Sequence, residues 1–300
     1  MDFALTAEQQ AIEEAVASVC AGFGDDYWRR RDSEGGFPDE FFQAMAKGGF
    51  LGMCIPEEYG GSGLGVTEAA IMMRTIARSG AGMSGASAIH INVFGLNPVV
   101  VYGTPEQKAR MLPGMVAGRE QACFAVTEPN TGLNTTQLKT RAVPRNDRYV
   151  VNGQKVWIST AQVAKKILLL ARTTPLKEVK KPTHGLTLFY TDFDRSRIQV
   201  HEIEKMGRKA VDSNELFFED FEIPMEDRIG EEGRGFEYIL HGMNPERILI
   251  AAEAVGSASS PWSGRPPTRR SASSSTGRSA RTRRSSIRSP RTGWRSKRPG

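Results

Sequence analysis

The sequence predicts an α+β fold with four parts: an all-α N-terminal domain, a middle antiparallel β-barrel-like domain, the start of a C-terminal helical bundle and a disordered tail. Three patterns support this prediction. Apolar residues recur at helical spacing over residues 1–118, short apolar runs alternate with turn residues over 119–230, and helical spacing returns over 231–256. Residues 257–300 follow none of these patterns.

The N-terminal domain opens with a helix-start signal. Thr6 is followed three residues later by Gln9, as in a capping box, and apolar residues then recur at helical spacing from Ile12. Further helices are expected over 39–47, 67–79 and 105–117, with glycine-rich breaks between them.

The middle domain is predicted from six short apolar runs bounded by Asn, Asp, Gly and Pro. They cover residues 122–127, 148–151, 155–159, 166–172, 186–190 and 215–221. Between the second and third runs stands Asn152-Gly153, a dipeptide typical of two-residue hairpin turns, so we expect a hairpin there.

The positive charge of the chain is confined to its tail. The whole chain carries a formal net charge of +6, but residues 257–300 contain twelve Lys/Arg, thirteen Ser and no acidic residue. Residues 1–256 therefore hold 28 basic and 34 acidic residues, and this body is acidic. A tail with so few large apolar groups cannot offset its ordering entropy by burial, so we expect it to be disordered.

The cysteines and the N-terminal residues favour a cytoplasmic protein. Cys20, Cys54 and Cys123 are odd in number and widely spaced, which argues against a disulfide framework or a zinc site. The four histidines are scattered and none has metal-ligand spacing, so no metal is expected. The first residues lack a secretory signal, and no apolar run approaches the ~20 residues that cross a bilayer.

Six short motifs occur in order along residues 5–256. They are LTAEQQ from Leu5, PEEYGG from Pro56, YGTPEQK from Tyr102, FAVTEP from Phe124, NGQKVWIS from Asn152, and KMG from Lys205 followed by LFFED from Leu216. Each resembles a segment of the acyl-CoA dehydrogenase family in the same place in the order. One such match is weak evidence, whereas six in sequence are specific. The resemblance implies FAD as cofactor.

The resemblance assigns flavin contacts to two strands and the loop between them. The expected cofactor-binding residues are Phe124, Val126, Thr127, Gly132, Trp157, Ile158 and Ser159. A flavin needs donors along its ring edge and an aromatic group that excludes water, which the hydroxyls and the indole would supply. The alternative is that Trp157 is a core aromatic residue and Thr127 an ordinary strand residue.

The loop after FAVTEP departs from the family pattern. The family has a GAGSD-like sequence there, whose Ser helps to hold the pantetheine part of CoA, and this chain has Asn130-Thr131-Gly132-Leu133-Asn134. Leu133 thus stands at a substrate-binding position without the hydroxyl.

The resemblance also assigns a catalytic base. Removing a proton next to a thioester carbonyl requires a carboxylate whose pKa is raised by an apolar pocket. Some family members, including isovaleryl- and long-chain-acyl-CoA dehydrogenases, carry it in an ERLxxA-like motif after the β-domain. Glu246 matches that Glu, and Arg247 matches an Arg that contacts CoA or anchors the helix. The alternative is a helix start with Asn244 as N-cap, Pro245 in the first position and Glu246 as a first-turn acid.

The expected function is therefore FAD-dependent oxidation of an acyl-CoA thioester to the trans-2-enoyl-CoA, impaired in this chain. Family members form homotetramers and pass electrons to an electron-transferring flavoprotein, so both are implied partners. Where the family continues with an RxxFGxxIxxxQ motif, this chain has Ser271–Pro290, which suggests a reading-frame shift near Gly256. Two alternatives stay open: an inactive flavin- or CoA-binding fragment, and a basic tail that binds nucleic acid.

Overall fold

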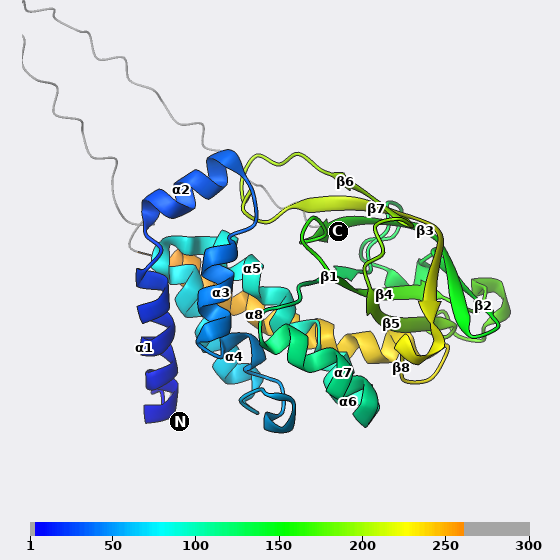
Figure 1. Ribbon diagram of the computed structural model, residues 1–300, viewed down its shortest axis with the longest axis horizontal. Coiled ribbons are helices and arrows are strands. Elements are labelled where there is room, and N and C mark those ends of the chain that lie inside the picture. The colour runs from blue at the N-terminus through cyan, green and yellow to red at the C-terminus, as the bar shows by residue number, and fades with distance from the viewer. Residues whose placement is uncertain (1–3, 261–300) are drawn as a thin grey trace, which may run out of the picture. The chain divides into compact units, whose positions relative to one another are not determined.

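The computed structural model describes residues 4–260, and its helices and strands follow one another in the predicted helical–β–helical order (Figure 1). The N-terminal helices are α1 (Ala7–Ala21), α2 (Asp25–Glu34), α3 (Asp39–Lys47), α4 (Val66–Ile76), α5 (Gly82–Phe94), α6 (Asn97–Tyr102) and α7 (Pro105–Val116). The strands are β1 (Ala122–Ala125), β2 (Arg141–Arg145), β3 (Arg148–Ser159), β4 (Lys166–Arg172), β5 (Leu186–Asp192), β6 (Ile198–Glu202), β7 (Ser213–Pro224) and β8 (Arg228–Ile229). Helix α8 (Gly235–Ala258) follows.

The predicted helix starts and spans agree with the structure in several places. The Thr6 hydroxyl accepts from the Gln9 N–H, and the Gln9 side chain accepts from the Thr6 N–H, which completes the capping box. α3 has the expected bounds, and α7 ends one residue early. A π-helical turn, Ala77–Ala81, joins α4 to α5. The sequence analysis did not predict α5 as a separate helix.

One curled sheet forms the middle domain, with the strand order β6-β7-β3-β2-β4-β5-β8. Its neighbours pair antiparallel except that β4 also pairs parallel with β1 and, at Arg172, with β2. β4 is buried on both faces: Ile167 and Leu169 belong to the core enclosed by the sheet. Leu168 and Leu170 pack in a second core with side chains of α6, α7 and α8. This two-sided burial explains why the strand is an unbroken apolar run.

The predicted hairpin at Asn152-Gly153 is wrong. Both flanking runs belong to the single strand β3, and Gly153 lies at a register shift against β7, where one strand bulges. The turn is at Asn146, with φ 55°, and Asp147, which join β2 to β3. The sequence analysis also missed β8, β2 and β6; β2 and β6 each contain a single buried residue, Ala142 and Ile198.

The helical stretch Val66–Tyr102 is, by length and composition, apolar enough to cross a membrane, and it is the one such stretch among the described residues. However, 72% of its most apolar window is buried inside the protein. It contains α4 and α5, which supply much of the N-terminal core, and α6, whose Val99 packs in the core shared with the sheet, so burial inside the protein accounts for its apolar character.

Helix α8 runs without interruption through Pro245. A proline at this position removes the hydrogen bond that its N–H would give to the carbonyl of His241. That carbonyl instead accepts from Asn97 Nδ2 at 2.6 Å, so it is not left unpaired. The alternative of a helix start at Asn244 is wrong, because the helix begins at Gly235. It ends at Ala258, so the predicted tail boundary falls two residues early, and residues 261–300 lie outside the described part.

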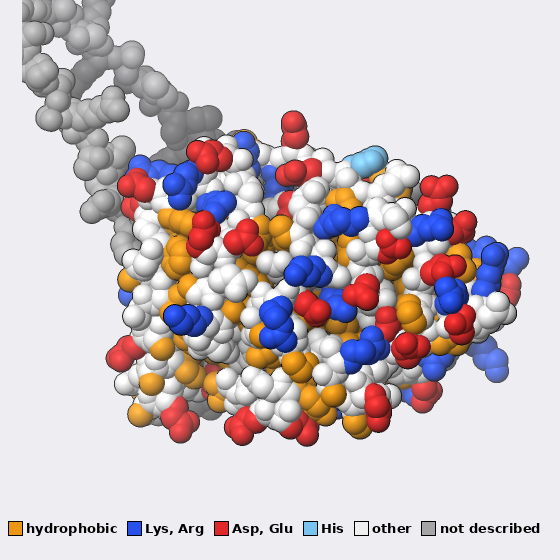
Figure 2. Space-filling view, in the orientation of Figure 1, with side chains coloured by type: hydrophobic (Ala, Val, Ile, Leu, Met, Phe, Trp, Pro, Cys, Tyr) orange, Lys and Arg blue, Asp and Glu red, His pale blue; other side chains and the backbone are white. Residues whose placement is uncertain are grey.

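Charged side chains of both signs are mixed over the face of the described residues that is visible in Figure 2. This face shows no continuous basic patch of the kind that follows a nucleic-acid backbone. The predicted basic tail lies outside the described residues, so its role is not addressed by this surface.

Gly153→Ala is expected to destabilise the protein by about 2 kcal/mol, because φ at Gly153 is 151° and a Cβ there would lie 2.6 Å from Thr140 Oγ1 and 2.7 Å from Thr140 Cα. Urea unfolding followed by tryptophan fluorescence measures the change. Gly207→Ala is the control, since a Cβ there meets nothing within 4 Å. Equal stability of the two variants would contradict the bulge interpretation.

Candidate functional site

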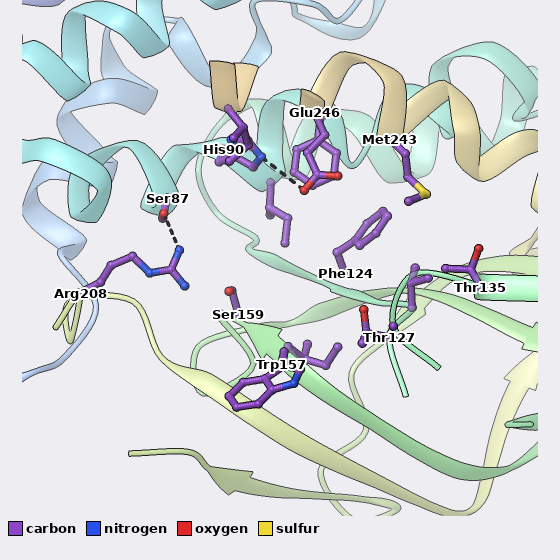
Figure 3. A pocket seen from close by; sticks show the side chains of 16 residues that line it. Ser87, His90, Phe124, Thr127, Thr135, Trp157, Ser159, Arg208, Met243 and Glu246 are labelled. Carbon is purple, nitrogen blue, oxygen red and sulfur yellow. Dashed lines mark hydrogen bonds and ion pairs between the residues drawn. The ribbon is translucent and has the colours of Figure 1, made fainter. Parts of the chain in front are cut away.

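A cavity of about 350 Å³ lies between the β-domain and helices α5 and α8. All seven residues assigned above to the flavin line it: Phe124, Val126, Thr127, Gly132, Trp157, Ile158 and Ser159. Glu246 lines it from α8, facing Thr127 and Ser159 on the β side (Figure 3). Segments more than a hundred residues apart therefore meet at one site. Contact with a flavin stays a prediction.

The β wall of the cavity offers polar groups and an aromatic plane. The hydroxyls of Thr127 and Ser159 have no hydrogen-bond partner among the described residues. Trp157 has φ 62° at a register shift in β3, and its side chain is 62% exposed. The alternative that Trp157 is a core aromatic residue is therefore wrong. A bulge next to a cavity commonly re-aims a side chain, as here. Hydroxyls of this kind can donate hydrogen bonds to the edge of an isoalloxazine ring, and an indole beside them can cover its face.

A buried ion pair holds this wall in place. The Lys155 side chain is completely buried, and its Nζ lies 3.0 Å from Glu128 Oε1. The same Nζ donates to the carbonyls of Val126, at 2.9 Å, and Leu170, at 2.8 Å. The Glu128 carboxylate also accepts from the N–H groups of Lys139 and Thr140.

The ionisation of this pair is set by two opposing effects. Burial lowers the pKa of Lys155 to about 8, although the Glu128 charge opposes that change. Burial alone would raise the pKa of the Glu128 carboxyl, but the Lys155 charge and the hydrogen bonds from residues 139 and 140 bring it below its usual value. Both groups are therefore charged at neutral pH, and neither can lose its partner without leaving a buried charge unpaired.

Glu246 has the environment of a general base. Its side chain is 34% exposed and points from the middle of α8 into the cavity (Figure 3). Burial raises the pKa of its carboxyl, opposed by the positive charges of His90 and Arg247, and the nearby Glu253 raises it further. A carboxyl whose pKa lies above its usual range accepts a proton more readily near neutral pH.

His90 of α5 and Glu253 of α8 form a second buried contact behind Glu246. His90 Nδ1 lies 2.5 Å from Glu253 Oε1, and His90 Nε2 lies 4.0 Å from Glu246 Oε1. The Glu253 side chain is completely buried. The sequence analysis missed both residues.

Further lining residues were also missed. They are Ser87, Ile91 and Phe94 of α5, Thr135, Arg208, Met243 and Ile250. The α5 residues lie on a helix that was not predicted. One sequence signal could have pointed to this region: a histidine, His90, inside a strongly apolar helical run. A second was a pair of acids seven residues apart, Glu246 and Glu253, in a later helix. A seven-residue spacing places both acids on one helix face.

The two predicted substrate residues do not line the cavity. Leu133 is fully exposed at the tip of its loop. The exposed Arg247 folds back on its own helix, where it donates to Asn244 Oδ1 at 2.6 Å and to the Met243 carbonyl. Of the two roles predicted for Arg247, this geometry fits anchoring of the helix. Contact of either residue with CoA stays a prediction.

The described residues contain no group of three His, Cys, Asp or Glu side chains that could hold a metal ion. The three cysteines are free thiols. Burial raises the pKa of each thiol, to about 11 for Cys54, so none has the thiolate character of a nucleophile.

Comparison with known proteins covers both domains. The family description "Acyl-CoA dehydrogenase, N-terminal domain" matches residues 6–119, and "Acyl-CoA dehydrogenase, middle domain" matches residues 123–221. The chain is 33% identical over 260 residues to the probable acyl-CoA dehydrogenase YngJ of Bacillus subtilis, covering 86% of this chain and 67% of that protein.

Two solved structures share the fold. Butyryl-CoA dehydrogenase from Megasphaera elsdenii matches with a TM-score of 0.78 and 29% identity, covering 85% of this chain and 67% of that one. The FAD complex of PigA matches with a TM-score of 0.79 and 26% identity, covering 86% and 67%. The chain spans 58% to 67% of the length of the first curated relatives that it matches.

Replacing one member of the buried ion pair should destabilise the protein strongly. Lys155→Met leaves the Glu128 carboxylate buried and unpaired, and Glu128→Gln does the same to the Lys155 ammonium, so each should lower the free energy of unfolding by about 3–5 kcal/mol. The double variant should lose less than the sum of the two changes, because no charge is then left unpaired. Urea unfolding of the four proteins measures this coupling, and strictly additive losses would contradict it.

Proposed function

We propose that this chain, which belongs to the acyl-CoA dehydrogenase family, provides the flavin-binding and proton-abstracting part of an enzyme that oxidises an acyl-CoA thioester to the trans-2-enoyl-CoA. The observation that carries the proposal is the position of Glu246, half-buried with a raised pKa, on the wall opposite the free hydroxyls and the indole. A planar cofactor on one side and a base on the other leave room for a flat acyl group between them.

FAD is the cofactor of this family. The residues present fit its isoalloxazine ring, because Thr127 and Ser159 have free hydroxyls and Trp157 presents its indole at the cavity. Bound there, FAD would supply the two-electron acceptor for the β-hydrogen of the substrate and its electron pair.

Glu246 removes the other hydrogen. Its carboxylate takes the α-proton, and the electrons of that C–H bond become the second bond between the α- and β-carbons. Ile91 and Phe94 of α5, together with Phe124, make the surroundings apolar. This environment limits water at the reacting carbons and keeps the pKa of Glu246 raised.

The partners follow from the same proposal. The substrate is an acyl-CoA, the electrons leave to an electron-transferring flavoprotein, the complete enzyme is a homotetramer, and it works in the bacterial cytoplasm. A base at the start of the ERIL motif favours branched or long acyl chains by resemblance to the family members that share it. A flavin- or CoA-binding protein without catalytic activity is the second candidate.

We also propose that the reading frame shifts near Gly256. The match to YngJ covers 86% of this chain, and residues 257–300 combine twelve Lys/Arg with no acidic residue. Sequencing the gene across codon 256 should show a net shift of one base, with a downstream frame that encodes an RxxFGxxIxxxQ-like motif. An intact gene whose only open frame encodes the Arg/Ser tail would rule this proposal out.

The catalytic role of Glu246 is tested in a version of the chain with the frame restored. Glu246→Gln keeps the shape of the side chain and removes its basicity, so bleaching of the flavin by an acyl-CoA should slow by at least ~10²–10⁴-fold. The flavin content and the unfolding midpoint should stay unchanged. Stopped-flow absorbance of the flavin gives the rate.

Glu237→Gln is the matched control for this test. Glu237 lies in the first turn of the same helix, where it pairs with Arg234 away from the cavity, so this variant should bleach at the original rate. If Glu246→Gln bleaches as fast as Glu237→Gln, the base is another residue. If no acyl-CoA bleaches the unaltered protein while flavin and CoA still bind, the second candidate function is correct.

A further inference from the structure

The His90–Glu253 contact places a proton-bearing pair directly behind the proposed base. Glu246 and Glu253 are seven residues apart on α8, which is about two helical turns, so both carboxylates face α5. His90 of α5 stands between them and points toward Glu246 (Figure 3).

The geometry requires a proton between His90 and Glu253. Their facing atoms, Nδ1 and Oε1, lie 2.5 Å apart, a distance at which two unprotonated atoms would repel each other. The Glu253 side chain is completely buried, and its Oε2 has no partner among the described residues. A buried carboxylate in this position needs a positive or proton-donating neighbour, and His90 is that neighbour.

The other ring nitrogen of His90 faces the Glu246 carboxylate. His90 Nε2 is buried and has no hydrogen-bond partner among the described residues. Its nearest carboxylate oxygen is Glu246 Oε1 at 4.0 Å, so a small rotation of the Glu246 side chain would bring the two into hydrogen-bond contact.

We propose that Glu253, His90 and Glu246 form a chain of positioning contacts. Glu253 holds the His90 ring, and Nε2 of that ring orients one oxygen of Glu246. The charge of the ring thereby sets the pH at which Glu246 becomes a base. The inference rests on the proposed function of Glu246, and it makes His90 and Glu253 positioning residues. The other oxygen of Glu246 is left to face the substrate.

The charged groups around Glu246 determine whether these contacts raise or lower its pKa. α5 contributes His90, α8 contributes Arg247 and Glu253, and the loop between β6 and β7 contributes Arg208 at the far end of the cavity. The β strands contribute only uncharged residues to the cavity lining. The charge of Glu253 raises the pKa of Glu246, whereas the charge of His90 lowers it.

Glu253→Gln separates these two routes. If Glu253 acts only by its own charge, removing that charge should lower the pH at which Glu246 titrates. If it acts through His90, the ring is no longer held by the Glu253 carboxylate and its contact with Glu246 is weakened, so the titration of Glu246 should move upward by about one pH unit. His90→Asn should move it upward too, because Asn can still contact Glu253 but reaches no oxygen of Glu246.

The test uses the full 300-residue chain labelled with ¹³C at the glutamate side-chain carboxyls. NMR titration gives the midpoint of the Glu246 signal, which is assigned by its loss in Glu246→Gln. Neither cofactor nor substrate is needed, so the result does not depend on catalysis. Glu237→Gln, on the same helix but away from the cavity, should leave the midpoint unchanged.

The expected result is an upward shift in Glu253→Gln and in His90→Asn, and a reversal of the Glu253→Gln effect when His90 is already Asn. An unchanged or lowered midpoint in a folded Glu253→Gln protein overturns the inference, whatever His90→Asn does. Fast flavin bleaching by Glu246→Gln would reject the proposed base while leaving the measured coupling intact, so the two failures are distinguishable.

Discussion

The buried contact between Lys155 and Glu128 is the constraint on which the cavity wall depends. Lys155 is two residues before Trp157, and Glu128 directly follows Thr127, so one ion pair joins β3 to the segment after β1 where both line the cavity. The ammonium also donates to the carbonyls of Val126, directly after β1, and Leu170 of β4, which ties both segments to β3. Burying two charges is unfavourable unless every remaining hydrogen bond is made, and here backbone N–H groups complete the carboxylate. The main effect of the pair is therefore to favour this one arrangement of the cavity wall, and its net contribution to the stability of the protein is small.

Helix α8 imposes the second constraint, because it connects the β-domain to the N-terminal helices. Tyr238 and Ile239 near its start pack with side chains of the sheet, and Leu249 packs with the N-terminal core. Near its end, Gly256 approaches α4 so closely that a Cβ would lie 2.2 Å from the Arg74 carbonyl oxygen. A helix held at both ends places Glu246, between them, at a fixed distance from the β wall. The carboxylate is therefore positioned by packing rather than by a flexible loop.

Much of this arrangement could be predicted from the sequence, since local signals and motifs carried it. The capping box at Thr6 and the bounds of α3 depend on local residues, and motif resemblance identified Glu246 and the seven residues assigned to the flavin, all of which line the cavity. The hairpin prediction failed for a physical reason. Asn-Gly favours a turn locally, but the bulge at Gly153 uses the same backbone freedom within a strand whose other residues pair with β7 along its whole length. Tertiary pairing overrode a local preference.

What the sequence could not provide is the identity of partners that meet across the fold. His90 and Glu253 are 163 residues apart, and neither belongs to a motif, so their contact depends on how α5 packs against α8. The same limit applies to Lys155, which stands inside a recognised motif but whose partners lie on β4 and in the segment that follows β1. Motif resemblance identified residues that line the cavity, whereas the residues that position those side chains lie behind the cavity wall and belong to no motif or have partners outside their motif. In the proposed site, His90 and Glu253 are such positioning residues, because they lie behind the Glu246 carboxylate and contribute to the charge around it.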